Sequence, residues 1–168
     1  LNPMFCCSGR KWERRKSCSG FGGSDNFTLF HLVLKSDWDK AQSKDGKCSN
    51  YYPPTYKQDG MTHLTKDSKF LLGVGNNFYK QVPGDFSVLC IDVRKLTHPL
   101  KFEAAAAVGN IKSNVKGEST VLWPHLYGPI NSSAVFQQLS VAREDDGTFS
   151  SVEGLGLAAK EQPNPRPC

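Results

Sequence analysis

The chain has 168 residues, of which 38% are hydrophobic and 22% are charged, and it has a formal net charge of +5 at pH 7. This length suits one domain with tails, and the composition is that of a folded chain on the polar side. No run approaches the ~18 apolar residues that a membrane span needs, and no amino-terminal apolar stretch resembles a secretory signal.

The positive charge is unevenly distributed. The first 27 residues hold five basic side chains against two acidic ones, so the remainder is close to neutral. A neutral domain lacks the basic surface typical of nucleic-acid binding, and we expect no nucleic-acid partner. The six cysteines form no C-x-x-C pair, which disfavours a zinc ribbon or a redox motif. We therefore expect a reduced, intracellular, cytoplasmic protein.

Residues 1–26 are predicted to be a flexible basic leader, because they end in a Gly- and Ser-rich stretch and contain few aliphatic side chains. If Met4 were the start, Cys6 and Cys7 would stand just ahead of a basic cluster. This arrangement resembles the doubly palmitoylated amino terminus of neuromodulin-type proteins, and two acyl chains suffice for stable membrane attachment. The alternatives are an organelle transit peptide or an arbitrary leader.

The domain is predicted to span residues 27–152. Residues 27–34 are almost wholly apolar and predict a buried strand, in which His31 shares a face with two aliphatic residues. Ser36 is predicted to cap a helix that ends at Gly46, with Trp38 facing inward. Residues 47–60 predict a loop rich in tyrosine, typical of a pocket wall or a docking surface.

Residues 60–65 predict a short strand carrying His63, and Thr65 is predicted to cap the next helix, which ends near residue 80. The glycines within this helix, Gly73 and Gly75, indicate close approach of a sheet or ligand, or tolerated accidents. Residues 86–93 predict a central buried strand after a turn at 82–85.

The second half of the domain predicts further strands. Residues from 101 onward predict a strand displaying Glu103, followed by a mobile loop over 105–119. Residues 123–130, W-P-H-L-Y-G-P-I, contain two prolines and predict a stiff loop, neither helix nor central strand, that fixes His125 and Tyr127. Strands are predicted over 134–141 and, after a D-G turn, over 148–152 as an edge strand, with a Pro-rich tail over 153–168.

The predicted elements are about six short strands and two helices, both in the first half, which is an α+β domain. Three histidines, His31, His63 and His125, fall on two strands and the stiff loop, whereas His98 stands in a turn and is expected at the surface. Converging histidines can ligate a catalytic metal, or donate hydrogen bonds to ribose hydroxyls or phosphate. No spacing along the chain decides between these two uses.

The same residues carry a resemblance to a known family. F-H-L near His31, D-G-M-T-H-L-T around His63, L-C-I-D-V, F-E at Glu103 and W-P-H-L-Y-G-P-I resemble, in this order, the family called domain of unknown function 952. The similarity spans about residues 28–149. This sequence has Asp59 and a Met-Thr pair where the family more often shows E-G-F-I-H, and its loop over 105–119 is longer.

The resemblance implies a fold like that of the ADP-ribosyltransferase superfamily, a split, mostly antiparallel core that clamps NAD. It implies that His31 binds ribose, that His63 with Thr65 forms a second motif, and that His125 with Tyr127 forms a third. No carboxylate is evident at the third position, and Glu103 is a candidate substitute. The resemblance therefore implies catalytic roles for His31, His63, His125, Tyr127 and Glu103, and cofactor-binding roles for His31, Thr65 and Tyr127.

Three functions follow as hypotheses. The first is an NAD-binding enzyme that transfers ADP-ribose, with a positive charge developing on the ribose. The second is a metal-dependent enzyme with His31, His63 and His125 as ligands. The third is a non-catalytic module that binds a small molecule or nucleotide and is tethered to a membrane through Cys6 and Cys7.

Overall fold

The structure is a computed structural model that describes residues 27–42 and 49–158. The predicted leader, with Cys6 and Cys7, lies outside these residues. Within the described part of the chain, no helix has the length and apolar character needed to cross a membrane.

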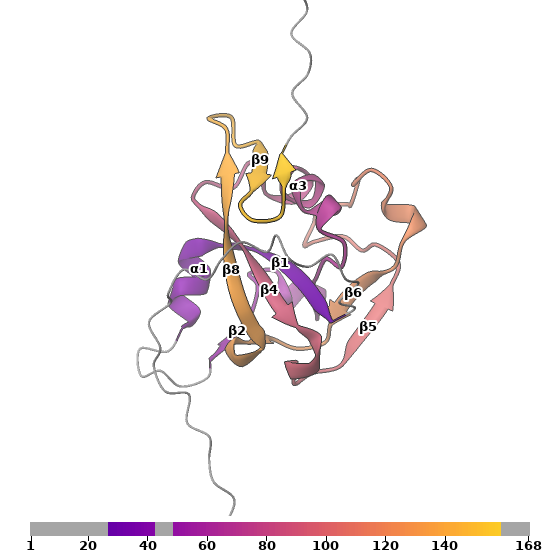
Figure 1. The fold of residues 1–168 in the computed structure, drawn as a ribbon. Coiled ribbons are helices and arrows are strands. Elements are labelled where there is room, and N and C mark those ends of the chain that lie inside the picture. The colour runs from indigo at the N-terminus through magenta and orange to yellow at the C-terminus, as the bar shows by residue number, and fades with distance from the viewer. Residues whose placement is uncertain (1–26, 43–48, 159–168) are drawn as a thin grey trace, which may run out of the picture.

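The fold is α+β, as predicted, and the three α-helices lie in the first half of the chain (Figure 1). The helical elements are α1 (Lys35–Ala41), α2 (Tyr56–Asp59), η1 (Ser68–Phe70), α3 (Leu71–Val74), η2 (Gly75–Tyr79), η3 (Val93–Lys95), η4 (Glu118–Thr120) and η5 (Ser132–Ala134). The strands are β1 (Thr28–Leu34), β2 (Asn50–Tyr51), β3 (Thr62–His63), β4 (Phe86–Asp92), β5 (Leu100–Glu103), β6 (Trp123–Leu126), β7 (Ile130–Asn131), β8 (Val135–Arg143), β9 (Phe149–Val152) and β10 (Leu157–Ala158).

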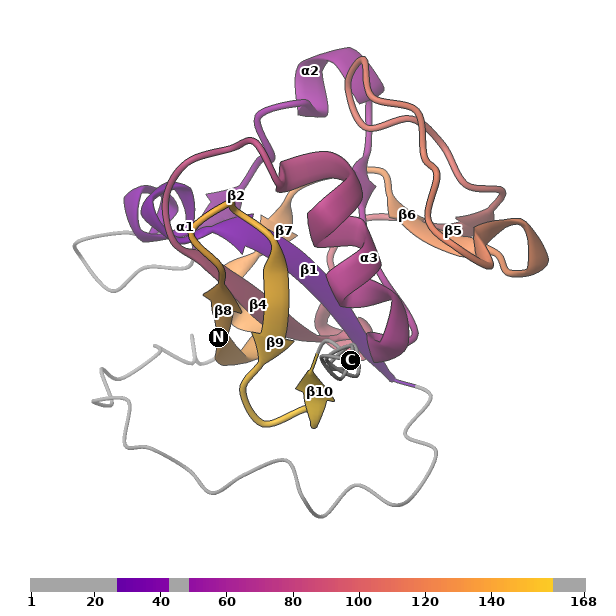
Figure 2. The same cartoon turned by 90° about the horizontal axis from the view of Figure 1, so that it is seen from above.

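The strands form three antiparallel sheets. The largest has the order β1-β4-β8-β9-β10, a second has the order β3-β6-β5, and β2 pairs with β7. The large sheet and the three-stranded sheet are joined where Phe30 of β1 and Thr65 exchange backbone hydrogen bonds of 2.8 Å. Figure 2 shows α3 alongside β1, between that strand and β6, so helix and both sheets meet at one place.

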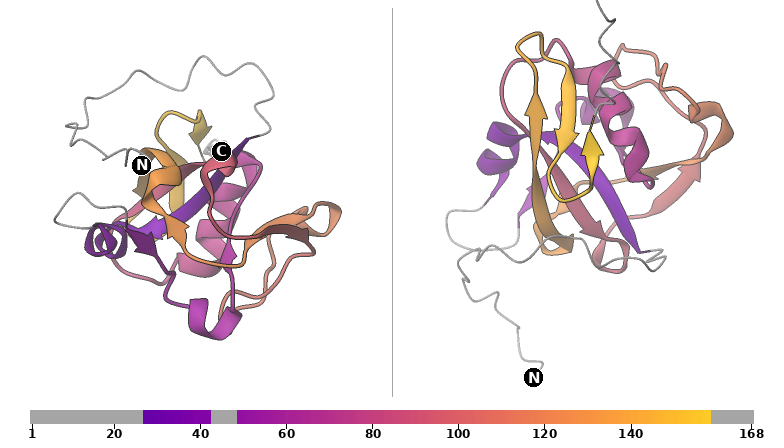
Figure 3. Two further views of the ribbon diagram at one scale, coloured as in Figure 1. Left: turned by 90° about the horizontal axis from the view of Figure 1, so that it is seen from below. Right: turned by 45° about the horizontal axis from the view of Figure 1, so that its top comes forward.

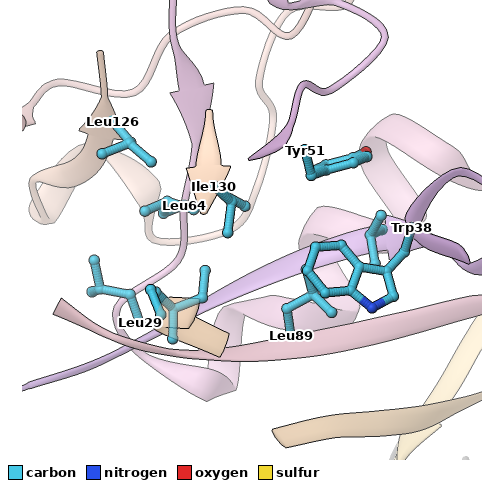
Figure 4. Packing of buried hydrophobic residues seen from close by; sticks show 10 residues of the cluster. Leu29, Trp38, Tyr51, Leu64, Leu89, Leu126 and Ile130 are labelled. Atoms are coloured by element: carbon cyan, nitrogen blue, oxygen red, sulfur yellow. The ribbon is translucent and has the colours of Figure 1, made fainter. Parts of the chain in front are cut away.

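Two hydrophobic clusters cover the faces of the large sheet. Leu29 and Val33 of β1 contribute to one cluster, together with Trp38 of α1, Leu64 and residues of β2, β4, β6 and β7 (Figure 4). The alternate residue Leu32 contributes to the other, with α3 and β9. Successive residues of a strand point to opposite faces, so β1 is buried on both, as its nearly continuous apolar sequence predicts. Every residue of β4 is buried as well.

Several predicted boundaries are corrected. Ser36 does not cap α1, because the backbone N–H of Lys35 bonds to Asp85 O at 2.8 Å and the chain enters the helix directly from β1. α1 also ends at Ala41 rather than at Gly46. Thr65 does not cap the next helix, because its backbone pairs with β1; Asp67 accepts a bond from the N–H of Lys69 instead.

Three elements were missed. The stretch predicted as a tyrosine-rich loop contains β2 and α2, and Tyr51 of β2 is buried against the rings of His31 and Trp38. The stretch predicted as a tail contains β10, and β9 is therefore not an edge strand. The ribbon in Figure 3 shows β10 following the turn after β9.

The stiff loop prediction over 123–130 is wrong in part, because Trp123–Leu126 forms β6, the central strand of its sheet. Proline lacks a donor, but its fixed backbone angle is compatible with extended structure. Pro124 contributes only its carbonyl, which accepts a 2.9 Å hydrogen bond from Leu64 N–H. The missing proline N–H leaves this pair with one hydrogen bond, and the β3–β6 ladder ends there, after the pair of His63 and His125.

The close packing of the helix on the large sheet requires a glycine at position 75. A Cβ atom at this position would lie 2.6 Å from the ring of Phe149, whereas a Cβ atom at Gly73 would meet only Val115 at 3.1 Å. The close approach predicted for this helix is therefore an approach to β9. Gly75→Ala is expected to lower the free energy of unfolding by about 1–3 kcal/mol through overpacking. Urea denaturation checks this, and a smaller loss for Gly73→Ala is the matched comparison; equal losses would contradict it.

Candidate functional site

One pocket lies where β1, β3, β6 and the α3–η2 helix meet. His31, His63 and His125 line it, one from each strand, and Thr65 lies beside them. The other lining side chains are mostly apolar: Leu32, Leu64, Val74, Phe78, Tyr79, Ala105, Ala106, Val108, Ser113 and Trp123. The three histidines predicted from the sequence thus share one site.

Strand pairing brings two of the histidines together. His63 of β3 is directly opposite His125 of β6 in the antiparallel register. Residues opposite one another point to the same side of a sheet, and the two imidazole rings lie edge to face with their centroids 5.2 Å apart. His31 reaches the same place from the large sheet, where its Nδ1 lies 2.8 Å from His63 O.

Each imidazole has one ring nitrogen occupied. A carbonyl can only accept, so Nδ1–H of His31 donates to His63 O. Nε2–H of His63 donates to Asp59 Oδ2 at 3.1 Å, and Nδ1–H of His125 donates to Glu103 Oε2 at 3.1 Å. These partners determine which nitrogen of each ring carries the proton.

The second nitrogen of each ring is open to the pocket. No fully buried side-chain nitrogen or oxygen in residues 27–42 and 49–158 lacks a hydrogen-bond partner. The rings of His31 and His125 are buried, yet no group among the described residues bonds their Nε2 atoms. These nitrogens therefore face the free space, where a neutral imidazole offers a lone pair to a hydroxyl donor.

Burial keeps two of the imidazoles uncharged at neutral pH. Desolvation lowers the pKa of His31 to about 4, against a smaller opposing effect of its hydrogen bond to His63 O. Desolvation likewise lowers the pKa of His63, and the nearby His125 adds to this, while the Asp59 hydrogen bond opposes it.

Glu103 and Tyr127 lie behind His125 rather than in the pocket. The Tyr127 hydroxyl donates to Glu103 Oε2 at 2.8 Å, the same oxygen that accepts from His125. These two hydrogen bonds, that of Tyr127 first, lower the pKa of Glu103, so this carboxylate is ionised at neutral pH. The three residues form a chain from pocket to surface, since the Glu103 side chain is 39% exposed.

Asp59 is a site residue that the sequence analysis did not select. Its buried carboxylate bonds His63 and also accepts from the N–H of Gly109, which follows the pocket residue Val108. The signal in the sequence was an acidic residue four positions before a histidine, across a glycine turn. His98 was predicted at the surface and is exposed there.

One of the three hypotheses from the sequence offers His31, His63 and His125 as metal ligands. Among the residues that the structure describes, no three His, Cys, Asp or Glu side chains are arranged to hold a metal ion.

Fold and site together define an α+β protein with a histidine-lined pocket between two antiparallel sheets. The sequence model of the family described as "Protein of unknown function (DUF952)" matches residues 32–138, well over half of the chain. The chain therefore belongs to the DUF952 family. No curated protein matches it.

Solved structures of one bacterial protein share the fold. The crystal structure of protein CC0527 from Caulobacter crescentus has a TM-score of 0.54 and 20% sequence identity, and the match covers 73% of this chain and 93% of that one. A double mutant of CC0527 gives a TM-score of 0.54 at 19% identity over the same shares. At this identity the likeness concerns the fold alone.

Proposed function

We propose that the histidine pocket binds the nicotinamide-ribose part of NAD and that the protein is an ADP-ribosyl-transferring enzyme. The observation that carries this proposal is the convergence of His31, His63 and His125, from two different sheets, on one pocket with apolar walls. The family resemblance to NAD-clamping folds, seen in the order of the same motifs, points to the same ligand.

The lining chemistry fits this part of the dinucleotide. The free nitrogen of His31 can accept a hydrogen bond from a ribose hydroxyl. Phe78 and Trp123 supply flat apolar surface for an aromatic ring. Among the described residues that line the pocket there is no lysine or arginine, so an uncharged sugar suits it better than a phosphate.

His125 has the geometry of a general base. In the proposed reaction the bond between ribose C1′ and the nicotinamide nitrogen breaks, its electron pair stays with the nitrogen, and neutral nicotinamide leaves. A water or acceptor hydroxyl then bonds to C1′ and gives its proton to Nε2 of His125. Glu103 holds Nδ1–H and stabilises the imidazolium that forms, which is the role of a carboxylate behind a catalytic histidine.

Entry of such a ligand requires movement of the loop between β5 and β6, residues 104–122, called the covering loop below. The cavity volume is about 40 Å³, which is enough for a few waters and too little for a ribose. Four of the lining residues belong to this loop: Ala105, Ala106, Val108 and Ser113.

Calorimetric titration of the 168-residue chain with NAD tests the proposal. We expect binding in the micromolar range, weakened about tenfold by His31→Ala, since this variant loses a hydrogen bond to a ribose hydroxyl. His125→Ala, which removes the proposed base, is expected to slow the release of nicotinamide. His98→Gln, at an exposed histidine, is the matched control and binds as the parent chain does.

Release of nicotinamide, followed by chromatography, separates the enzyme from a binding module. Binding without release in the presence of water and of hydroxyl, amine and carboxylate acceptors would identify a non-catalytic nucleotide-binding domain. No heat from the folded parent chain would refute NAD as the ligand.

A further inference from the structure

We infer that Asp59 is a positioning residue that orients His63 and, through the same carboxylate, holds the covering loop closed over the pocket. The identity of the ligand rests on the proposed function, whereas the orientation of His63 and the closure of the covering loop do not. It joins two features that are far apart in the sequence, a histidine ring on β3 and the loop before β6.

The contacts of Asp59 are buried. Its side chain is 5% exposed, at the last position of α2. Oδ2 accepts from Nε2–H of His63 at 3.1 Å, and the N–H of Gly109 lies 3.0 Å from Oδ1 and 3.1 Å from Oδ2. Burying a carboxylate without hydrogen-bond donors is unfavourable. The N–H groups of His63 and Gly109 both compensate for the burial of the Asp59 carboxylate.

For His63, the consequence is a defined tautomer and ring orientation. With Nε2–H donating to Asp59, Nδ1 is the nitrogen with the lone pair. The ring is also held edge to face against His125, at a centroid distance of 5.2 Å. Without the carboxylate, the ring is free to turn and to carry its proton on the other nitrogen.

The second consequence is that Asp59 holds the covering loop against the pocket. Val108 lines the pocket, and the next residue, Gly109, has a backbone φ of +57° that turns its N–H onto Asp59. The neighbouring contact, Gln58 Nε2 to Asn110 Oδ1 at 2.7 Å, is exposed. Water competes for an exposed hydrogen bond, so the buried contact to Asp59 contributes more to closure.

One carboxylate therefore links access to the pocket with the orientation of a lining histidine. A ligand larger than a few waters enters only when the covering loop moves, and movement at Gly109 takes one donor away from Asp59. When the loop closes over a ligand, Gly109 returns to the carboxylate and His63 regains its orientation. Asp59 touches no ligand in this scheme, so its role is to position.

Asp59→Asn tests the inference, with two readouts that need no ligand. Amide hydrogen exchange over residues 104–112 is expected to become about tenfold faster or more, from the loss of a hydrogen bond to a charged group. The ring ¹⁵N shifts of His63 are expected to change from a single Nε2–H tautomer to a mixture, while those of His125 stay as they are. NAD affinity is expected to fall as well.

Two control variants separate this role from a general loss of stability. Asp145→Asn, at an exposed turn carboxylate, should change neither readout. Asn110→Ala cuts the exposed loop contact and should speed exchange less than Asp59→Asn does, with the His63 tautomer unchanged. Exchange that rises evenly over the whole chain in Asp59→Asn, or a covering loop that exchanges as slowly as in the parent, overturns the inference.

The parent chain gives a test that requires no variant. Its His63 ring must carry the proton on Nε2, and the opposite tautomer overturns the inference even if Asp59→Asn fails to fold. Failure of NAD to bind the parent chain would refute the proposed ligand, whereas the exchange and tautomer readouts would still decide the role of Asp59.

Discussion

Replacing Phe149 by alanine is expected to lower the free energy of unfolding by about 3–5 kcal/mol, the cost of deleting a fully buried aromatic side chain. Phe149 is 1% exposed on β9 and packs edge to face against Phe86 at a centroid distance of 5.1 Å. The Arg143 guanidinium lies 4.7 Å from its ring centroid, and Gly75 allows the helix to approach its other side.

The neighbours of Phe149 cannot close over the space that the substitution leaves. Arg143 is held by backbone carbonyls, among them Val82 O at 2.9 Å and Gly84 O at 2.8 Å. A site that relaxes little after truncation retains its cavity and has a cost at the upper end of the range.

Urea denaturation of Phe149→Ala beside Phe136→Ala checks this expectation. Phe136, on the adjacent strand β8, is 45% exposed, so its removal should change the free energy of unfolding by no more than about 0.5 kcal/mol. A lower midpoint with an unchanged slope would show a change in stability alone. Similar losses for the two variants would contradict the assignment of Phe149 to the core.

The large sheet was predictable because a strand that is buried on both faces has a continuous run of apolar residues in its own sequence. β1 and β4 are runs of apolar residues, and such runs indicate buried strands without knowledge of their partners. The α+β class and the early position of the helices followed from the same local patterns. β10 was not predictable, because it is two residues long and exists only through its pairing with β9.

β6 shows why a local rule failed. Two prolines within residues 123–130 argue against a central strand, since proline cannot donate to a ladder. The rule concerns hydrogen bonds, however, and Pro124 stands at the end of the β3–β6 ladder, opposite Leu64, and only its carbonyl is used. That circumstance depends on the length of a strand some 60 residues earlier, which no local pattern contains.

The histidines could be selected from the sequence, but their convergence could not be derived from it. His63 and His125 meet because β3 and β6 pair in one particular register, and a shift by one residue would send one ring to the opposite face. Asp59 was missed for a similar reason. Its two partners come from a strand and from a distant loop, so its role appears only when the chain is folded.

Lowering the pH from 7 to 5 is expected to destabilise the protein by about 2 kcal/mol through His31 alone. The pKa of His31 falls from 6.5 to about 4 on folding, because burial disfavours the charged ring. In the unfolded chain the His31 imidazole therefore binds a proton below pH 6.5, whereas in the folded chain it does so only below about pH 4. Stability is fully present above pH 6.5 and is lost progressively as the pH falls through this window.

His63 adds to the loss in the same direction, since its pKa is also lowered by burial. The carboxylates with lowered pKa values, such as Glu103, act in another window: their contribution is lost only as the pH falls below the ordinary carboxylate pKa. A loss of stability between pH 6.5 and 5 is therefore assigned to the buried histidines.

Urea denaturation at a series of pH values, for the parent chain and for His31→Gln, measures the contribution of His31. Glutamine can still donate to His63 O but does not titrate, so the variant should lose about 2 kcal/mol less than the parent between pH 7 and 5. His98→Gln, at an exposed histidine, should follow the parent curve. Parallel curves for the parent and His31→Gln would mean that the His31 ring is not held neutral in the pocket, and the hydroxyl-accepting nitrogen on which NAD recognition depends would then be absent.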